Sequence, residues 1–174
     1  MQVTQQRAGS CEHTLNTKFS MVLLCFLFLF AEGVRAEDAK TRVEQLFAQY
    51  FVYFNSGESE LIAKNIISPP VQLSDFDSHE VWLTQSEISS GFALAIKDLQ
   101  SKGWSKSVIN ELDVCVVADN LAFVELNYSR QNTSGEPMPP AERRGLYVVL
   151  KSDLGWRIIA DYHHDIDKQL ECSI

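Results

Sequence analysis

The sequence lacks the short motifs that mark several large enzyme classes. It contains no serine-nucleophile elbow, no phosphate-binding glycine loop and no CxxC pair. The sequence therefore gives no motif for a serine hydrolase, for a loop that binds nucleotide phosphates or for a dithiol redox centre. Any chemistry must come from residues that the fold brings together.

Basic residues are scarce. The chain has 15 Lys and Arg against 23 Asp and Glu; three of the basic and two of the acidic residues fall in residues 1–36, which leaves 12 and 21 in the remainder. The only basic pair in that part is Arg143-Arg144. Because phosphate binding needs clustered cations, the composition argues against nucleic acid as a partner, and equally against an anionic membrane surface.

Histidine is also rare, and its spacing does not suit a metal. The segment Tyr162-His163-His164-Asp165 holds two of the four histidines, and His79 is the only other one beyond residue 36. Adjacent residues of a strand point to opposite faces, and neither an HxH nor an HxxxH spacing with a third ligand occurs. We therefore predict no metal site and no cofactor.

A secretory leader is the clearest feature of the N-terminal region. Residues 21–30, MVLLCFLFLF, form an uncharged apolar run that follows Lys18 and precedes Val34-Arg35-Ala36. This run is too short for a transmembrane span, which needs about 20 apolar residues, so a signal peptide with cleavage after Ala36 is the better interpretation. We predict export to the periplasm or the cell exterior, with no stable membrane span after cleavage.

The exported part is predicted to hold a single domain over residues 37–168, followed by a tail over 169–174. Of the four cysteines, Cys115 and Cys172 remain after cleavage and are the candidate pair for one disulfide. The alternative is that Cys115, in the apolar run 114–117, is an ordinary core residue.

The hydrophobic pattern changes period along the domain. Helical spacing with capping-box and glycine signals predicts helices over 37–57, 58–67 and 84–103, with short strands at 71–73 and 81–83. Extended runs then follow over 111–117, 121–130, 144–150 and 155–163. Helices followed by strands favour an α+β domain with three helices packed on one face of a curved, mainly antiparallel sheet.

The last two runs, 146–150 and 156–160, flank a Ser-Asp-Leu-Gly turn and predict a hairpin. With this hairpin, its Gly-Trp-Arg-Ile step and the preceding alternating Ala-Val-Leu-Tyr strand, the chain resembles the nuclear-transport-factor-2-like superfamily of cone-shaped domains. It is similar to SnoaL-like and ketosteroid-isomerase-like members, including exported bacterial proteins. The resemblance covers roughly residues 38–165 and implies a pocket between the long helix and the bent sheet.

The resemblance also implies candidate residues. Tyr50 lies on the inward stripe of the first helix, where the family places a phenol donor, and Asp75 and Asp77 lie near the usual place of a carboxylate base. The acid expected within the later strands has no counterpart, since Glu125 and Asn127 alternate away from the apolar face. The residues predicted to line a pocket are Tyr50, Phe54, Trp82, Tyr128, Tyr162 and His163.

Each candidate also has a purely structural interpretation. Tyr50 suits an amphipathic core position, and Asp75 and Asp77 suit a turn in which carboxylates bond the local backbone. Three functions therefore stay open. The first is an exported domain that binds a small apolar or amphipathic molecule, as a homodimer through the sheet face bearing Phe123, Glu125 and Asn127. The second is an isomerase, dehydratase or cyclase, and the third is a protein-interaction module with a vestigial pocket.

Overall fold

The computed structural model describes residues 38–170 of the 174-residue chain. The predicted leader, including its apolar segment 21–30, lies outside the described residues, as do the end of the C-terminal tail and Cys172, so export stays a prediction. Within residues 38–170, no helix combines the length and apolar character needed to cross a membrane.

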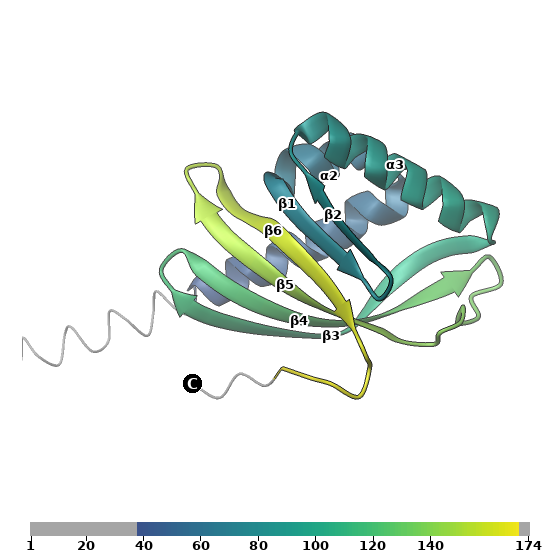
Figure 1. Ribbon diagram of the computed structural model, residues 1–174. Coiled ribbons are helices and arrows are strands. Elements are labelled where there is room, and N and C mark those ends of the chain that lie inside the picture. Colours follow the sequence, from purple (N-terminus) through teal and green to yellow (C-terminus); the bar gives the residue numbers. More distant parts are fainter. Residues whose placement is uncertain (1–37, 171–174) are drawn as a thin grey trace, which may run out of the picture. The chain divides into compact units, whose positions relative to one another are not determined.

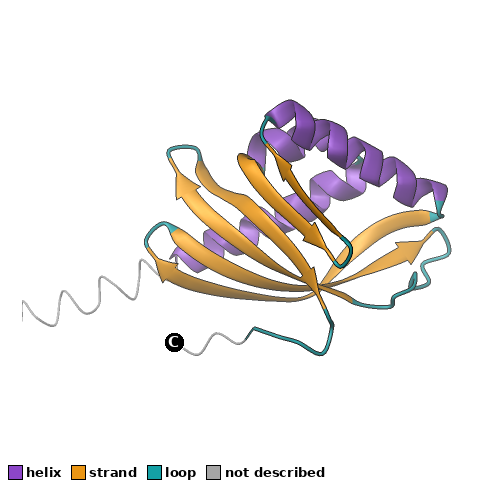
Figure 2. Ribbon diagram, viewed as in Figure 1, coloured by secondary structure: helices purple, strands orange, loops and turns teal. Residues whose placement is uncertain are grey.

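Three helices and six strands follow in the order that the sequence pattern predicts. The first helix occupies residues 38–56 and is followed by α2 (Ser59–Asn65), β1 (Ile67–Asp75), β2 (Ser78–Trp82) and α3 (Gln85–Ser101). The strands β3 (Trp104–Ala118), β4 (Leu121–Asn132), β5 (Arg143–Ser152) and β6 (Gly155–His164) complete the domain. The α+β class is confirmed, with the helices on one face of the curved sheet (Figure 1; Figure 2).

All six strands belong to one sheet in the order β2-β1-β6-β5-β4-β3. Among the strands of the described residues, only β1 and β6 pair in parallel. The sequence pattern did not reveal this pairing, which places the end of β1 beside the end of β6. As a result, a residue near position 75 comes close to residues near position 163.

Strand β1 is longer than the predicted run 71–73. Pro69 and Pro70, which follow the predicted second helix, lie inside the strand. They fall in the gap between the Ile67–Ile158 and Gln72–Ala160 pairs, where the ladder with β6 is irregular. A proline has no N–H to donate, and it is therefore tolerated at such an irregularity.

The core lies between the helices and the sheet. The first helix buries a stripe spaced three and four residues apart, which ends at Gly57 in a left-handed conformation (φ 78°). In α3, the predicted capping box of Thr84 and Glu87 is present. The alternating side chains of β4 contribute Ala122, Val124, Leu126 and Tyr128 to the same core.

The opposite face of β4 has less free surface than expected for a dimer interface. Within the single chain, Glu125 is 2% exposed and Asn127 is 5% exposed, while Phe123 is half-buried. Asn127 accepts a hydrogen bond from Asn110 (2.9 Å) and donates one to Glu142 (2.9 Å). The homodimer stays a prediction, and Phe123 is the part of this surface left to contact a partner.

Candidate functional site

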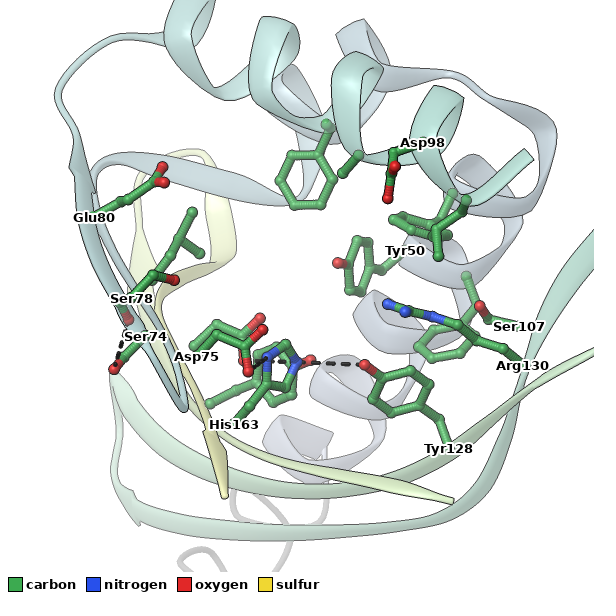
Figure 3. A pocket seen from close by; sticks show the side chains of 18 of the residues that line it. Tyr50, Ser74, Asp75, Ser78, Glu80, Asp98, Ser107, Tyr128, Arg130 and His163 are labelled. Carbon is green, nitrogen blue, oxygen red and sulfur yellow. Dashed lines mark hydrogen bonds and ion pairs between the residues drawn. The ribbon is translucent and has the colours of Figure 1, made fainter. Parts of the chain in front are cut away.

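A cavity of about 360 Å³ opens between the helices and the inner face of the sheet. Aromatic side chains form a large part of its walls, and its polar groups come from several strands (Figure 3). This volume lies in the range of small-molecule sites, about 300–1,000 Å³. The aromatic side chains of the lining are Tyr50, Phe51, Phe54, Trp82, Phe92, Tyr128 and Tyr147.

The aromatic wall is built by edge-to-face contacts. Tyr50 and Phe54, one helical turn apart, each meet Phe92 of α3 edge-on at 6.0 and 6.2 Å between ring centroids. Trp82, at the end of β2, meets the same ring at 5.8 Å. Such contacts fix ring orientations, so the wall has a defined shape before any ligand binds.

Trp82 can lie against α3 only because residue 91 is a glycine. A Cβ at Gly91 would overlap the six-membered ring of Trp82. We expect Gly91→Ala to displace the indole and to lower the free energy of unfolding by about 1–3 kcal/mol, as overpacking does. Urea denaturation and tryptophan fluorescence measure both effects. Ser90→Ala, on the exposed side of the same helix, is the control, and an unchanged Trp82 environment in Gly91→Ala would contradict close packing of the indole on α3.

The polar end of the cavity centres on Asp161 and His163 of β6. The Nε2 atom of His163 lies 3.9 Å from Oδ1 of Asp161 and 3.3 Å from the hydroxyl oxygen of Tyr128, and its Nδ1 lies 3.8 Å from Oδ1 of Asp75. Tyr147 pairs with Asp161 across the strands. One imidazole therefore stands between a buried and an exposed carboxylate, next to a phenol.

A bulge in β6 puts Asp161 and His163 in the cavity. Val148 pairs with Ala160 and Val149 with Ile158, so Ile159 is an extra residue with no partner of its own. A bulge of one residue reverses which side chains face the core. Before it, the core-facing residues are Trp156 and Ile158; beyond it, Asp161 and His163 line the cavity.

Gly145 leaves room for this pair. It lies opposite His163 in the β5–β6 ladder, and an added Cβ would stand 3.1 Å from Tyr147, 3.3 Å from Oδ1 of Asp161 and 3.3 Å from His163. A side chain at this position would press on both polar groups. The glycine that opens the hairpin sequence thus has a role in the site as well as in the strand.

The environment of Asp161 changes its acidity. Its side chain is 14% exposed, and one carboxyl oxygen, Oδ1, has no hydrogen-bond partner among residues 38–170. Burial raises the pKa of Asp161 to about 6, although nearby His163 and a hydrogen bond from Tyr147 oppose the rise. A carboxyl group with this pKa exchanges protons near neutral pH.

The surrounding phenols remain protonated. Burial, with a contribution from the charge of Asp161, raises the pKa of Tyr50 and of Tyr147 well above the usual range. Burial also raises the pKa of Tyr128. All three hydroxyls are therefore neutral at physiological pH. Tyr147 donates to Asp161, whereas the hydroxyls of Tyr50 and Tyr128 can donate to a carbonyl or hydroxyl oxygen of a ligand.

The structure brings most of the sequence-predicted residues to this cavity. Five of the six predicted pocket residues line it, and the exception is Tyr162, whose hydroxyl donates to Gln72 at 2.8 Å on the other side of the strand. The bulge at Ile159 explains this exception because it turns Tyr162 away and His163 inward. Their role in binding stays a prediction.

The predicted carboxylates behave differently from one another. Asp75 reaches the rim of the cavity with 61% of its side chain exposed, and its Oδ1 accepts a hydrogen bond from the Phe76 amide. Asp77 lies in the exposed turn after β1 and is not part of the lining. Asp161, which the sequence did not single out, is the carboxylate inside the cavity.

Among the described residues, no group of three or more His, Cys, Asp or Glu side chains is arranged to hold a metal ion. Cys115 is disulfide-bonded. Its predicted partner Cys172 lies outside the described residues, so that pairing stays a prediction.

Comparisons with solved structures show the same fold in bacterial proteins. An NTF2-like protein with a cystatin-like fold from Novosphingobium aromaticivorans gives a TM-score of 0.65 at 14% identity, covering 80% of this chain and 90% of that one. An NTF-2-like protein of unknown function from Shewanella oneidensis gives 0.58 at 14% identity, covering 72% and 98%. A provisionally assigned dehydratase of the NTF2-like family from Streptomyces avermitilis gives 0.57 at 12% identity, covering 74% and 96%.

A search of curated protein sequences finds no significant match. At these identities the structural likeness is evidence of fold alone. A family model described as NTF2-like protein (DUF6841) matches residues 37–166. Because this match spans most of the chain, the protein belongs to the NTF2-like family DUF6841.

Proposed function

We propose that this domain binds a small, partly apolar molecule and catalyses proton transfer on it, as an isomerase or dehydratase does. The observation that carries the proposal is the carboxyl of Asp161, which lies against the aromatic side chains of the cavity and has a pKa of about 6. Its Oδ1 is buried and has no hydrogen-bond partner among the described residues. A base with a pKa near the working pH is suited to general acid–base catalysis. Asp75 or Asp77, suggested by the family resemblance, would then be less suitable bases.

The roles follow from position. Asp161, as the carboxylate, would take a proton from a carbon next to a carbonyl group of the substrate. Its neighbour His163, 3.9 Å away, would return a proton or protonate a leaving hydroxyl. The neutral phenols of Tyr50 and Tyr128 would donate hydrogen bonds to the oxygen on which negative charge develops.

The cavity also bears on the other hypotheses. A pocket of about 360 Å³ with a carboxylate at its polar end favours a ligand over a vestigial pocket whose protein works only through its surface. A protein that only binds its ligand would use the same aromatic wall, but it would not need a carboxyl group with a raised pKa. The acid–base function accounts for this carboxyl group and the binding-only function does not.

A probe reaction can test the proposal before the substrate is identified. 5-Nitrobenzisoxazole opens when a base removes a single proton, and its product absorbs visible light. We expect the protein to catalyse this reaction, with a rate that rises with pH around a midpoint of about 6, because the carboxylate form is the base. Asp161→Asn should lower the rate by about 10².

The matched control is Asp153→Asn, in the exposed β5–β6 turn. It removes the same charge at a site remote from the cavity lining and should leave the rate unchanged. Equal rates for Asp161→Asn and the unmodified protein would refute Asp161 as the base.

The phenol next to His163 gives a second test. Removing the hydroxyl in Tyr128→Phe takes away the only side-chain hydrogen bond that the imidazole makes among the described residues. We expect the ring-nitrogen chemical shifts of His163 to change in proton–nitrogen NMR spectra, because Nε2 loses its partner. Tyr162→Phe, on the other side of the same strand end, should leave these chemical shifts unchanged. Identical chemical shifts in Tyr128→Phe and the unmodified protein would mean that the two side chains do not interact.

A further inference from the structure

We propose that Arg130 forms an anion-binding subsite, so that the ligand of this cavity is an amphipathic molecule carrying a carboxylate or another anionic group. The inference rests on the proposed function in that both use the same cavity. It concerns a different part of that cavity, however, and a different property of the ligand.

Arg130 occupies the core-facing position of β4 that follows Tyr128. Its guanidinium lies over the Tyr128 ring, 5.7 Å from the centroid, and reaches into the cavity between Tyr50 and Ser107 (Figure 3). It also lines a second cavity of about 390 Å³ at the ends of β4, β5 and β6. Tyr128, His163 and Asp75 line both cavities, so Arg130 stands where the two meet.

This cation is not neutralised within residues 38–170. None of the ion pairs there includes Arg130, whereas Arg144 contacts Glu111 at 3.3 Å and Glu125 at 3.6 Å. Within the described part of the chain, the buried Nε of Arg130 has no hydrogen-bond partner. A guanidinium that lacks acceptors in the protein is costly, and an anion bound in the cavity would pair with this side chain.

A second guanidinium adds to the positive potential. Arg143 lines the second cavity and donates to the carbonyls of Pro139 and Pro140, both at 2.8 Å. Burial and, next, the charge of Arg130 lower the pKa of Arg143, which places two cations near each other. Like charges this close favour an anion between or beside them.

Three of the four carboxylates that line the first cavity have partners of their own, and the fourth, Asp161, lies beside His163. Glu80 accepts a hydrogen bond from Trp82 at 2.9 Å, and Asp98 pairs with Lys102 at 2.6 Å. Asp75 is held by its own turn and lies 3.8 Å from His163. The acids at the rim have partners elsewhere, while the planar donor set of Arg130 is available to a carboxylate, phosphate or sulfonate oxygen.

A matched pair of dyes isolates the charge of the ligand. 1-Anilinonaphthalene-8-sulfonate carries one negative charge, and N-phenyl-1-naphthylamine has the same rings without it. We expect the sulfonate dye to bind at least tenfold more tightly than the neutral dye. Arg130→Gln should weaken the sulfonate dye at least tenfold and the neutral dye less than threefold, while Arg130→Lys, which keeps the charge, should retain an intermediate affinity.

Arg42→Gln, on the exposed surface of the first helix, is the control and should change neither affinity. Displacement of the dye by decanoate, decyl phosphate or decanol identifies the anionic group, and decanol should be the weakest competitor. Equal losses for both dyes in Arg130→Gln, or no loss in either, would overturn the subsite. So would failure of both dyes to bind the unmodified protein.

The two proposals can fail separately. Asp161→Asn should leave binding of the sulfonate dye intact or strengthen it, since it removes a negative charge from the cavity. If the protein binds the dye through Arg130 but does not open nitrobenzisoxazole, the subsite is supported and the acid–base function is refuted. The reverse result would support the acid–base function and refute the subsite.

Discussion

Asp161→Asn is expected to make the protein more stable at neutral pH. Burial raises the pKa of Asp161 from the usual 3.8 to about 6, so the folded protein favours the protonated carboxyl. Between these two pH values the folded state holds a proton that the unfolded state has lost. Stability therefore falls as pH rises through this window, by about 3 kcal/mol for two pKa units.

Asparagine is neutral at every pH and avoids that cost. The free energy of unfolding of Asp161→Asn should exceed that of the unmodified protein by about 2–3 kcal/mol at pH 7.5. The difference should vanish well below pH 3.8, where the carboxyl of Asp161 is protonated in both the folded and the unfolded state. Urea denaturation at the two pH values measures it, with Asp153→Asn as the control. A destabilised Asp161→Asn at pH 7.5 would mean that the ionised carboxylate is well satisfied in the fold.

Phe47→Ala is expected to have the largest effect on stability. Phe47 is fully buried on the first helix, and its ring meets Tyr147 edge-on at 5.1 Å. Removing a buried phenyl ring costs about 3–5 kcal/mol. Because Tyr147 contacts Asp161, the space left behind should also admit water to the carboxyl and lower the pKa of Asp161 toward its usual value.

Phe76→Ala is the matched control, since Phe76 is 66% exposed in the turn after β1. It should change the free energy of unfolding by less than about 0.5 kcal/mol. Denaturation curves give the stability and NMR titration the pKa. If Phe47→Ala lost stability while the pKa of Asp161 stayed at its original value, packing at Phe47 would not control the acidity of Asp161.

Much of the fold follows from local patterns. The capping box at Thr84 and Glu87, the turn before Gly155 and the alternation of β4 are each encoded within a few residues. The parallel pairing of β1 with β6 is not encoded locally, because it joins segments some 90 residues apart. For the same reason the sequence did not show that Asp75 lies close to His163.

The site was less predictable than the fold. Strict alternation from Trp156 and Ile158 puts Asp161 outside the core, and no residue type marks Ile159 as the bulge that brings it inside. One signal was available: an aspartate that directly follows the apolar run Ile158–Ala160 has to face water or a cavity. The sequence contains no signal for Arg130, because an arginine at the end of a strand is ordinarily solvated. In the structure its guanidinium lies over the Tyr128 ring and points inward.

The proposed function requires that Asp161, inside the cavity, has a pKa close to neutral pH. Carbon-13 NMR of protein labelled at the aspartate carboxyl carbons measures it directly, with Asp161→Asn used to assign the resonance. The structure predicts a midpoint of about 6 for Asp161. A midpoint near 4 would mean that the carboxyl is solvated or fully paired, and would contradict its role as a buried base.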